Sequence, residues 1–227
     1  MRRNLAGIAG VMVVASAFGA VAFAADQALS PAQIALFETD HLKEIGRPVR
    51  LDYTFLHRGG PEGDFADTVV ADIRAVHPDG SKDVWIDFLS GDRRVEMPPA
   101  MGFSANPLLV LFLEHDLKEM RLATGGSVEY FRNRISEAFA DRAELRPVEV
   151  TLDGKTLKAT EVAVAPFRGD PHLTKFPGLA GKTYRFVLSD AVPGGIYQMS
   201  TTPAPSGDAS GVFEERLTYV GEHEGAQ

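Results

Sequence analysis

Val49-Arg50-Leu51-Asp52-Tyr53-Thr54-Phe55 is the stretch that decides the fold of this chain. The odd positions are all apolar and the even positions are all polar. Side chains of a β-strand point alternately to the two faces of a sheet, so this period of two predicts a strand with one buried face. A domain built from such strands must cover their apolar face with another layer.

Similar segments follow along the chain and are joined mostly by short turns. We predict strands at about 68–76, 83–89, 148–152, 155–167, 184–188, 196–201 and 212–220. Asp153-Gly154, which lies between two of them, is a strong hairpin signal. Short turns join antiparallel neighbours, because a parallel pair needs a long crossover. The sequence shows no β-α-β alternation, so a doubly wound parallel sheet is not expected.

Helical patterns occur before the first strand and in the middle of the chain. The segment 30–46 begins with Ser-Pro, an N-cap residue followed by proline at the first helical position, and carries an apolar stripe. The segment 106–123 begins with Asn-Pro in the same way, and a second helix follows the cap Ser127. We therefore predict a mainly β (α+β) fold. Its curved antiparallel sheet or half-barrel is covered by an N-terminal helix and by a helical hairpin inserted at about 106–142.

The first 24 residues have the features of a secretory signal peptide. Arg2 and Arg3 form a basic start, residues 5–21 contain only apolar residues, Gly and Ser, and Ala-Phe-Ala at 22–24 fits a signal-peptidase site. A permanent membrane anchor is the alternative, but no positively charged flank follows. We expect cleavage before Ala25 and a single periplasmic domain over residues 25–227.

Composition excludes several classes of partner and site. The net charge is -8, and removal of the two leader arginines makes it -10. Such a chain is poorly suited to nucleic acids or anionic lipid head groups. The sequence holds no Cys, which excludes disulfides, a thiol nucleophile and a thiolate metal site. With 44% hydrophobic residues and 14 Phe, the chain has the composition of a folded domain with a sizeable core.

The predicted central helix carries six large apolar residues in a row, at positions 108–113. A helical turn that is apolar on every side is either buried completely or meets an apolar partner. Burial is the simpler interpretation, and the functional one is a lipophilic pocket between this helix and the sheet. The candidate lining is Leu109, Phe112, Leu113 and Met120 on the helix, facing Leu51, Tyr53, Phe55 and Trp85 or the Ile86 and Phe88 side of its strand.

The next turns of this helix are strongly polar. His115 and Glu119 are four residues apart and lie on one face, where they could contribute to a metal site. The other histidines show no matching spacing, so we expect no metal and interpret the segment as a solvated face with ion pairs such as Glu114 with Lys118. The arginines at 132, 134, 142 and 146 are interleaved with acidic residues and are interpreted in the same way.

Motifs of catalysis are missing from the sequence. It contains no G-x-S-x-G elbow, no G-x-G-x-x-G loop and no HExxH. Ser189-Asp190 and the following Pro-Gly-Gly are most simply a tight turn. We therefore predict no catalytic residue, no cofactor and no enzymatic activity.

The order of leader, helix, strands, helical insert and strands resembles that of half-barrel periplasmic lipoprotein carriers. The stretch YRFVLSDAVPGGI at 184–196 is similar to the late strand–turn–strand of such envelope proteins. No ligand-binding residue of that family can be matched to a position here. The resemblance implies an apolar cavity and a role in carrying or binding an apolar, lipid-like ligand. The alternatives are an envelope protein that binds a partner subunit through its apolar helix, and a hydrolase without a recognisable motif.

Overall fold

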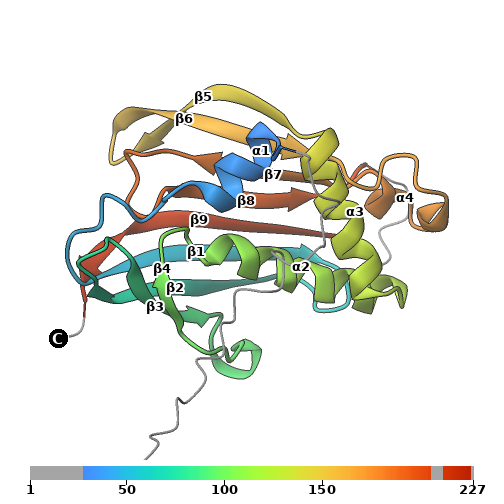
Figure 1. The fold of residues 1–227 in the computed structure, drawn as a ribbon. Coiled ribbons are helices and arrows are strands. Elements are labelled where there is room, and N and C mark those ends of the chain that lie inside the picture. The colour runs from blue at the N-terminus through green and yellow to red at the C-terminus, as the bar shows by residue number, and fades with distance from the viewer. Residues whose placement is uncertain (1–27, 206–211, 226–227) are drawn as a thin grey trace, which may run out of the picture.

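In the computed structural model, which describes residues 28–205 and 212–225, one curved sheet of nine antiparallel strands dominates the fold (Figure 1). The strand order is β4-β3-β2-β1-β9-β8-β7-β6-β5. The strands are β1 Val49–Gly59, β2 Phe65–Val76, β3 Lys82–Phe88, β4 Ala100–Phe103, β5 Glu144–Leu152, β6 Lys155–Val164, β7 Thr183–Leu188, β8 Ile196–Thr202 and β9 Phe213–Glu224. The expected leader, its cleavage site and residues 206–211 lie outside the described residues.

The sheet consists of two meanders that meet at its centre. Strands β1 to β4 run outward in chain order on one side, and β5 to β9 return toward β1 on the other. The antiparallel prediction is confirmed by the register of every pair. The strands predicted from the sequence do not include β4, which lies between β3 and the central helix. It pairs with β3 at only two positions and contains a glycine, so its sequence carries no visible alternation.

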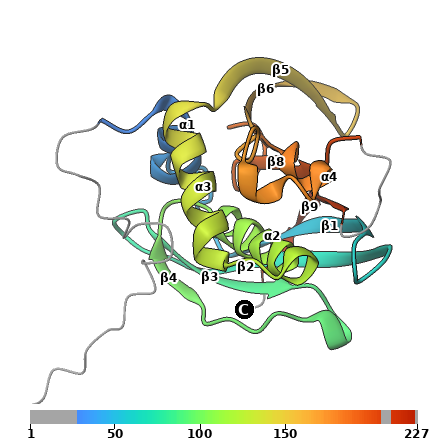
Figure 2. The same ribbon diagram turned by 90° about the vertical axis from the view of Figure 1, so that its right-hand side faces the viewer.

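Two helices, α2 (Leu108–Thr124) and α3 (Val128–Asp141), form a hairpin in the hollow of the sheet (Figures 1 and 2). The Asn106 side chain accepts a hydrogen bond from the backbone N–H of Leu108 at 3.1 Å, and Ser127 caps α3 in the same manner. Gly125, with a φ of 71°, ends α2. The predicted positions of both helices are confirmed.

The N-terminal helix is shorter than predicted. Ser30 and Gln33 form a capping box at α1 (Pro31–Gln33), which continues into a π-helical turn, η1 (Ile34–Glu38). The chain then leaves the helix at Thr39, whose N–H and hydroxyl both donate to the carbonyl of Ile34. The backbone of Thr39 is extended, with φ -69° and ψ 133°, so the helix ends there and does not reach Gly46.

Three further short helices lie in connecting segments: η2 (Gly91–Arg93), η3 (Pro171–Leu173) and α4 (Pro177–Ala180). Figure 2 looks along the sheet and shows it curling around α2, with α1 and α3 on its open side. One continuous apolar core fills the space between the sheet and these helices. The fold is thus a curved, unclosed antiparallel sheet covered by an N-terminal helix and a helical hairpin. No helix in the described part of the chain has the length and apolar character needed to cross a membrane.

Candidate functional site

Six residues of the predicted lining lie together where α2 packs on the sheet. Leu109, Phe112, Leu113, Met120, Tyr53 and Phe55 belong to one core, and each is at most 1% exposed. The Phe112 ring meets Phe186 of β7 edge to face, with ring centroids 6.4 Å apart. In this structure these side chains pack on one another and fill the interior.

Trp85 lies apart from the other six. On β3 its neighbour Val84 is buried, so alternation along the strand turns Trp85 to the outer, convex face. There it is the strand partner of Asp72, and the guanidinium of Arg74 covers its ring at 4.6 Å. The structure therefore separates this side chain from the interior beneath α2.

The polar half of α2 is not the solvated face expected from the sequence. His115, Asp116 and Glu119 are 9%, 0% and 4% exposed. That interpretation is wrong for these three residues because the helix lies inside the curved sheet, so its polar side also faces protein. Glu114 pairs with Arg132 of α3 at 2.9 Å and not with Lys118.

The strands opposite carry matching polar groups in one row across the sheet. His57 of β1, Glu215 of β9, Thr201 of β8 and Tyr184 of β7 are successive cross-strand partners. All four are buried. The row comes to lie under the polar half of α2 because each residue occupies an inward-facing position of its strand.

Residues of the row and of α2 contact one another and Lys182, which directly precedes β7. We call these residues the polar cluster: His57, His115, Asp116, Glu119, Lys182, Tyr184 and Glu215. His115 Nδ1 lies 2.8 Å from Glu215 Oε1. Lys182 Nζ and the Tyr184 hydroxyl each donate to one oxygen of the Asp116 carboxylate. The Lys182 ammonium also lies 3.5 Å from the centroid of the Phe213 ring. The cluster thus fastens α2 to the sheet by charged hydrogen bonds in a buried setting.

Electrostatics within the cluster favour specific protonation states. Burial is the largest single influence on the pKa of His115 and lowers it, but the hydrogen bond to Glu215 and the negative charges of Glu215, Glu119 and Asp116 together raise the pKa overall. Burial is also the largest single influence on the pKa of Glu215 and raises it, but the hydrogen bond to His115 and the nearby positive charges together lower the pKa overall. Burial raises the pKa of Glu119 to about 7, and the negative charge of Glu62 adds to the rise. His115 and Glu215 therefore form an ion pair near neutral pH, whereas Glu119 holds its proton up to about neutral pH.

The polar cluster can anchor α2 to the sheet through these contacts. Among the described residues there is no group of three or more His, Cys, Asp or Glu side chains arranged to hold a metal ion. The amine of Lys182 and the phenol of Tyr184 are fully buried and have no contact with solvent.

Sequence reasoning missed four members of the cluster, although a signal for them existed. Glu215 falls on the strand face that the apolar Phe213 and Leu217 define, and His57 follows Phe55 on the apolar face of β1. Lys182 and Tyr184 occupy the same alternation before Phe186. A charged residue at an inward-facing position of a strand is rare, because an unpaired buried charge is costly. That rarity indicates a buried partner.

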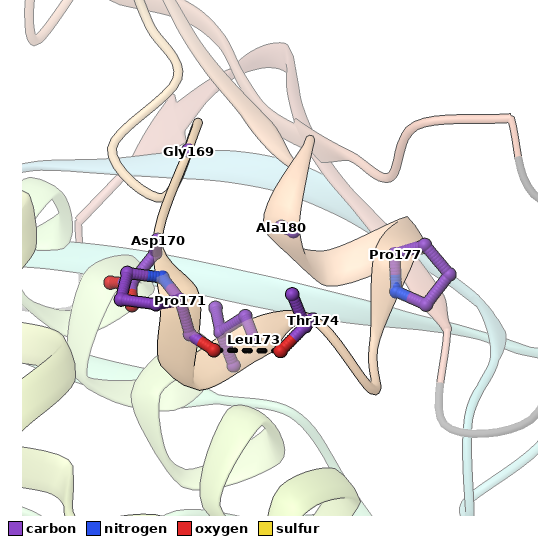
Figure 3. A pocket seen from close by; sticks show the side chains of 7 residues that line it. All are labelled: Gly169, Asp170, Pro171, Leu173, Thr174, Pro177 and Ala180. Atoms are coloured by element: carbon purple, nitrogen blue, oxygen red, sulfur yellow. Dashed lines mark hydrogen bonds between the residues drawn. The ribbon is translucent and has the colours of Figure 1, made fainter.

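Two hollows on the surface lie away from this interior. One has a volume of about 510 Å³ and is lined by Gly169, Asp170, Pro171, Leu173, Thr174, Pro177 and Ala180 (Figure 3). Its Asp170 carboxylate already accepts hydrogen bonds from Tyr130, Arg134 and the backbone N–H of His172. The other, of about 360 Å³, contains four arginines and two glutamates. Neither hollow includes a residue of the predicted apolar lining.

Comparison with known proteins gives only distant likenesses. No protein-family model matches the chain, and no curated protein matches it. Among solved structures, lipoprotein LppX of Mycobacterium tuberculosis is 11% identical with a TM-score of 0.34, covering 87% of this chain and 98% of its own. A LolA superfamily protein of Nitrosomonas europaea is 10% identical with a TM-score of 0.28, covering 86% and 94%. A DUF1329 family protein of Desulfovibrio piger is 11% identical with a TM-score of 0.27, covering 85% and 91%. The predicted resemblance to lipoprotein-carrier half-barrels is thus found again, but at these TM-scores it carries no argument about function.

Proposed function

We propose that this chain is an exported binding or carrier protein that takes an apolar, lipid-like ligand between the concave face of its sheet and α2. The observation that carries the proposal is the pairing of two apolar surfaces. A helical turn that is apolar on every side, 108–113, faces the apolar rows of β1 and β7. The proposed lining is the buried set Leu109, Phe112, Leu113, Met120, Tyr53 and Phe55, without Trp85.

Entry of a ligand requires movement of the helical hairpin, because the lining side chains fill the interior. The Glu114–Arg132 ion pair joins α2 to α3, so the two helices can move as one unit. Short segments at 104–107 and 142–143 connect this unit to the strands. Displacement of α2 exposes apolar surface, and an acyl chain that replaces the helix recovers about 25 cal/mol for each Å² that it covers.

Export to the periplasm is part of the proposal and rests on the leader at 1–24. N-terminal sequencing of the protein from the periplasmic fraction should give Ala25 as the first residue. Recovery of the chain with Met1 in the membrane fraction would contradict a soluble carrier.

Quenching by brominated fatty acids tests the proposed position of the ligand, since the chain has a single tryptophan. In the parent protein that reporter is Trp85, on the convex face. In the double variant Trp85→Phe, Phe112→Trp the reporter lies under α2, and Trp85→Phe, Phe55→Trp places it on the sheet opposite. Ligand bound in the interior should quench both inner reporters in a saturable manner and leave Trp85 unchanged.

Three other outcomes would overturn the proposal. Quenching of Trp85 alone would place the ligand on the outer face. If none of the three reporters shows saturable quenching, the protein does not bind the fatty acid and the proposal fails. A stable hetero-complex without lipid, seen by native mass spectrometry of the purified protein, would favour an envelope assembly protein.

A further inference from the structure

Two buried polar side chains, His57 on β1 and Glu119 on α2, face each other without a hydrogen bond between them. His57 Nδ1 lies 2.8 Å from the carbonyl oxygen of Gly63. A carbonyl oxygen only accepts hydrogen bonds, so Nδ1 carries the hydrogen and Nε2 of the neutral ring is an acceptor. The tautomer of His57 is therefore fixed by the backbone.

The atom that faces His57 Nε2 is also an acceptor when ionised. Glu119 Oε2 lies 3.9 Å from Nε2, and both atoms are buried without a hydrogen-bond partner. At 3.9 Å the two atoms lie beyond hydrogen-bond distance, and an ionised carboxylate has only lone pairs to offer to an imidazole lone pair. A proton on one of them lets the Glu119 side chain close this gap, and each atom then gains a partner.

The packing holds the two groups in this arrangement. The His57 ring is stacked between Phe65 and Phe213, at centroid distances of 4.8 and 5.8 Å and interplanar angles near 10°. It has no room to turn away from the helix, and its side chain is completely buried.

The charges around Glu119 come from three elements and are mainly negative. Glu62 lies in the β1–β2 turn, Glu215 on β9, and Asp116 and His115 on α2 itself. His115 is already paired with Glu215, and Asp116 with Lys182. No cation in this set is left to neutralise an ionised Glu119, so the surroundings favour its protonated form.

We propose that a proton shared between Glu119 Oε2 and His57 Nε2 holds α2 on β1, and that loss of this proton loosens the helix from the sheet. Burial raises the pKa of Glu119 from 4.5 to about 7. The folded protein therefore keeps a proton that the unfolded chain releases between these two values. The stabilisation is complete below about pH 4.5, declines as the pH rises, and is lost above about pH 7.

Urea unfolding between pH 5 and 8.5 tests the shared proton. Relative to the variant Glu119→Gln, the unfolding constant of the parent should rise by up to about tenfold per pH unit until about pH 7 and then follow the variant. The glutamine amide can donate to His57 Nε2 at every pH, so the variant should lack this slope. Glu149→Gln, on an exposed position of β5, is the matched control and should show the same pH slope as the parent.

A spectroscopic measurement on the unchanged protein covers the case that Glu119→Gln does not fold. The NMR signal of the Glu119 carboxyl carbon should titrate near pH 7, and the His57 ring nitrogens should report a hydrogen on Nδ1. Titration of Glu119 near pH 4.5, or a parent slope equal to that of Glu119→Gln, would overturn the proposal.

The consequence for ligand uptake rests on the proposed function and has its own readout. Uptake of a brominated fatty acid should be faster at pH 8 than at pH 6 in the parent and equally fast at both in Glu119→Gln. If Glu119→Gln lacks the pH slope of the parent and neither protein takes up the fatty acid, the proton contact stands and only the carrier role is removed.

Discussion

Phe112 is a fully buried aromatic residue in the interior between α2 and the sheet. Its side chain is 0% exposed and meets the Phe186 ring edge to face. Phe112→Asp should therefore lose at least about 3–5 kcal/mol in free energy of unfolding, since an aromatic side chain is removed and a carboxylate is buried. Leu122→Asp on the same helix is the control, because Leu122 is 61% exposed and should change stability by only about 0.5 kcal/mol.

Chemical denaturation of both variants gives the comparison. A small loss in Phe112→Asp would mean that water reaches this position in the folded protein. The interior would then open more readily than the static packing indicates.

Lys182 and Asp116 form an ion pair whose two side chains are completely buried. Lys182→Met should destabilise the fold by about 3–5 kcal/mol, because it leaves the Asp116 carboxylate without its counter-charge. The double variant Lys182→Met, Asp116→Leu should recover most of this loss, since an apolar pair needs no counter-charge.

Urea melts of Lys182→Met, the double variant and Lys155→Met complete the comparison. Lys155 is exposed at the start of β6, so its variant should melt like the parent. Equal losses in the Lys182 single and double variants would show that the lysine acts through packing and not through its charge.

At the scale of the elements, the β7–β8 turn holds the start of α2 in place. Gly194 has a φ of 79°, and its carbonyl accepts a hydrogen bond from the Asn106 side chain at 2.8 Å. An added Cβ would lie 2.5 Å from Leu51 Cδ1. Gly194→Ala should therefore cost clearly more than the roughly 1 kcal/mol of a left-handed alanine.

Gly154→Ala separates backbone strain from crowding. Gly154 has a similar φ of 73°, but nothing lies within 4 Å of its added Cβ. Thermal unfolding of the two variants should rank Gly194→Ala as the less stable. The same loss in both would mean that Leu51 moves aside at no cost.

Elements with a strong local pattern were predictable from the sequence, and those that depend on distant partners were not. The alternation in β1 and the caps Asn106 and Ser127 act within a few residues, so strand and helix positions follow from them. Strand β4 has only four residues and exists because β3 offers it two partners.

The candidate site divides in the same way. The burial of Phe112 follows from an apolar run, but the contact of His57 with Glu119 needs the register of β1 and the placement of α2 together. Trp85 shows the limit clearly. Its strand was predicted, while the face to which it points depended on the one-residue phase of the alternation.

For the molecule as a whole, we expect core burial and charged contacts to hold the fold without a metal, and the sequence excludes disulfides. The sequence has no Cys, and the described residues offer no group that could hold a metal ion. The thermal midpoint should therefore be the same with and without EDTA, and with and without dithiothreitol. A fall of many degrees in EDTA would point to a metal bound by ligands other than those in the described part of the chain.

The central pair of the sheet also sets the order in which the chain can fold. β1 begins at Val49 and its neighbour β9 ends at Glu224, so the seam between the two meanders joins the two ends of the domain. Contacts of such long sequence separation form late and slowly. Until the last strand arrives, each meander exposes an unpaired edge at this seam. With this topology the seam stays unpaired until β9 has been synthesised, and an open chain is the form that the export proposed above would require.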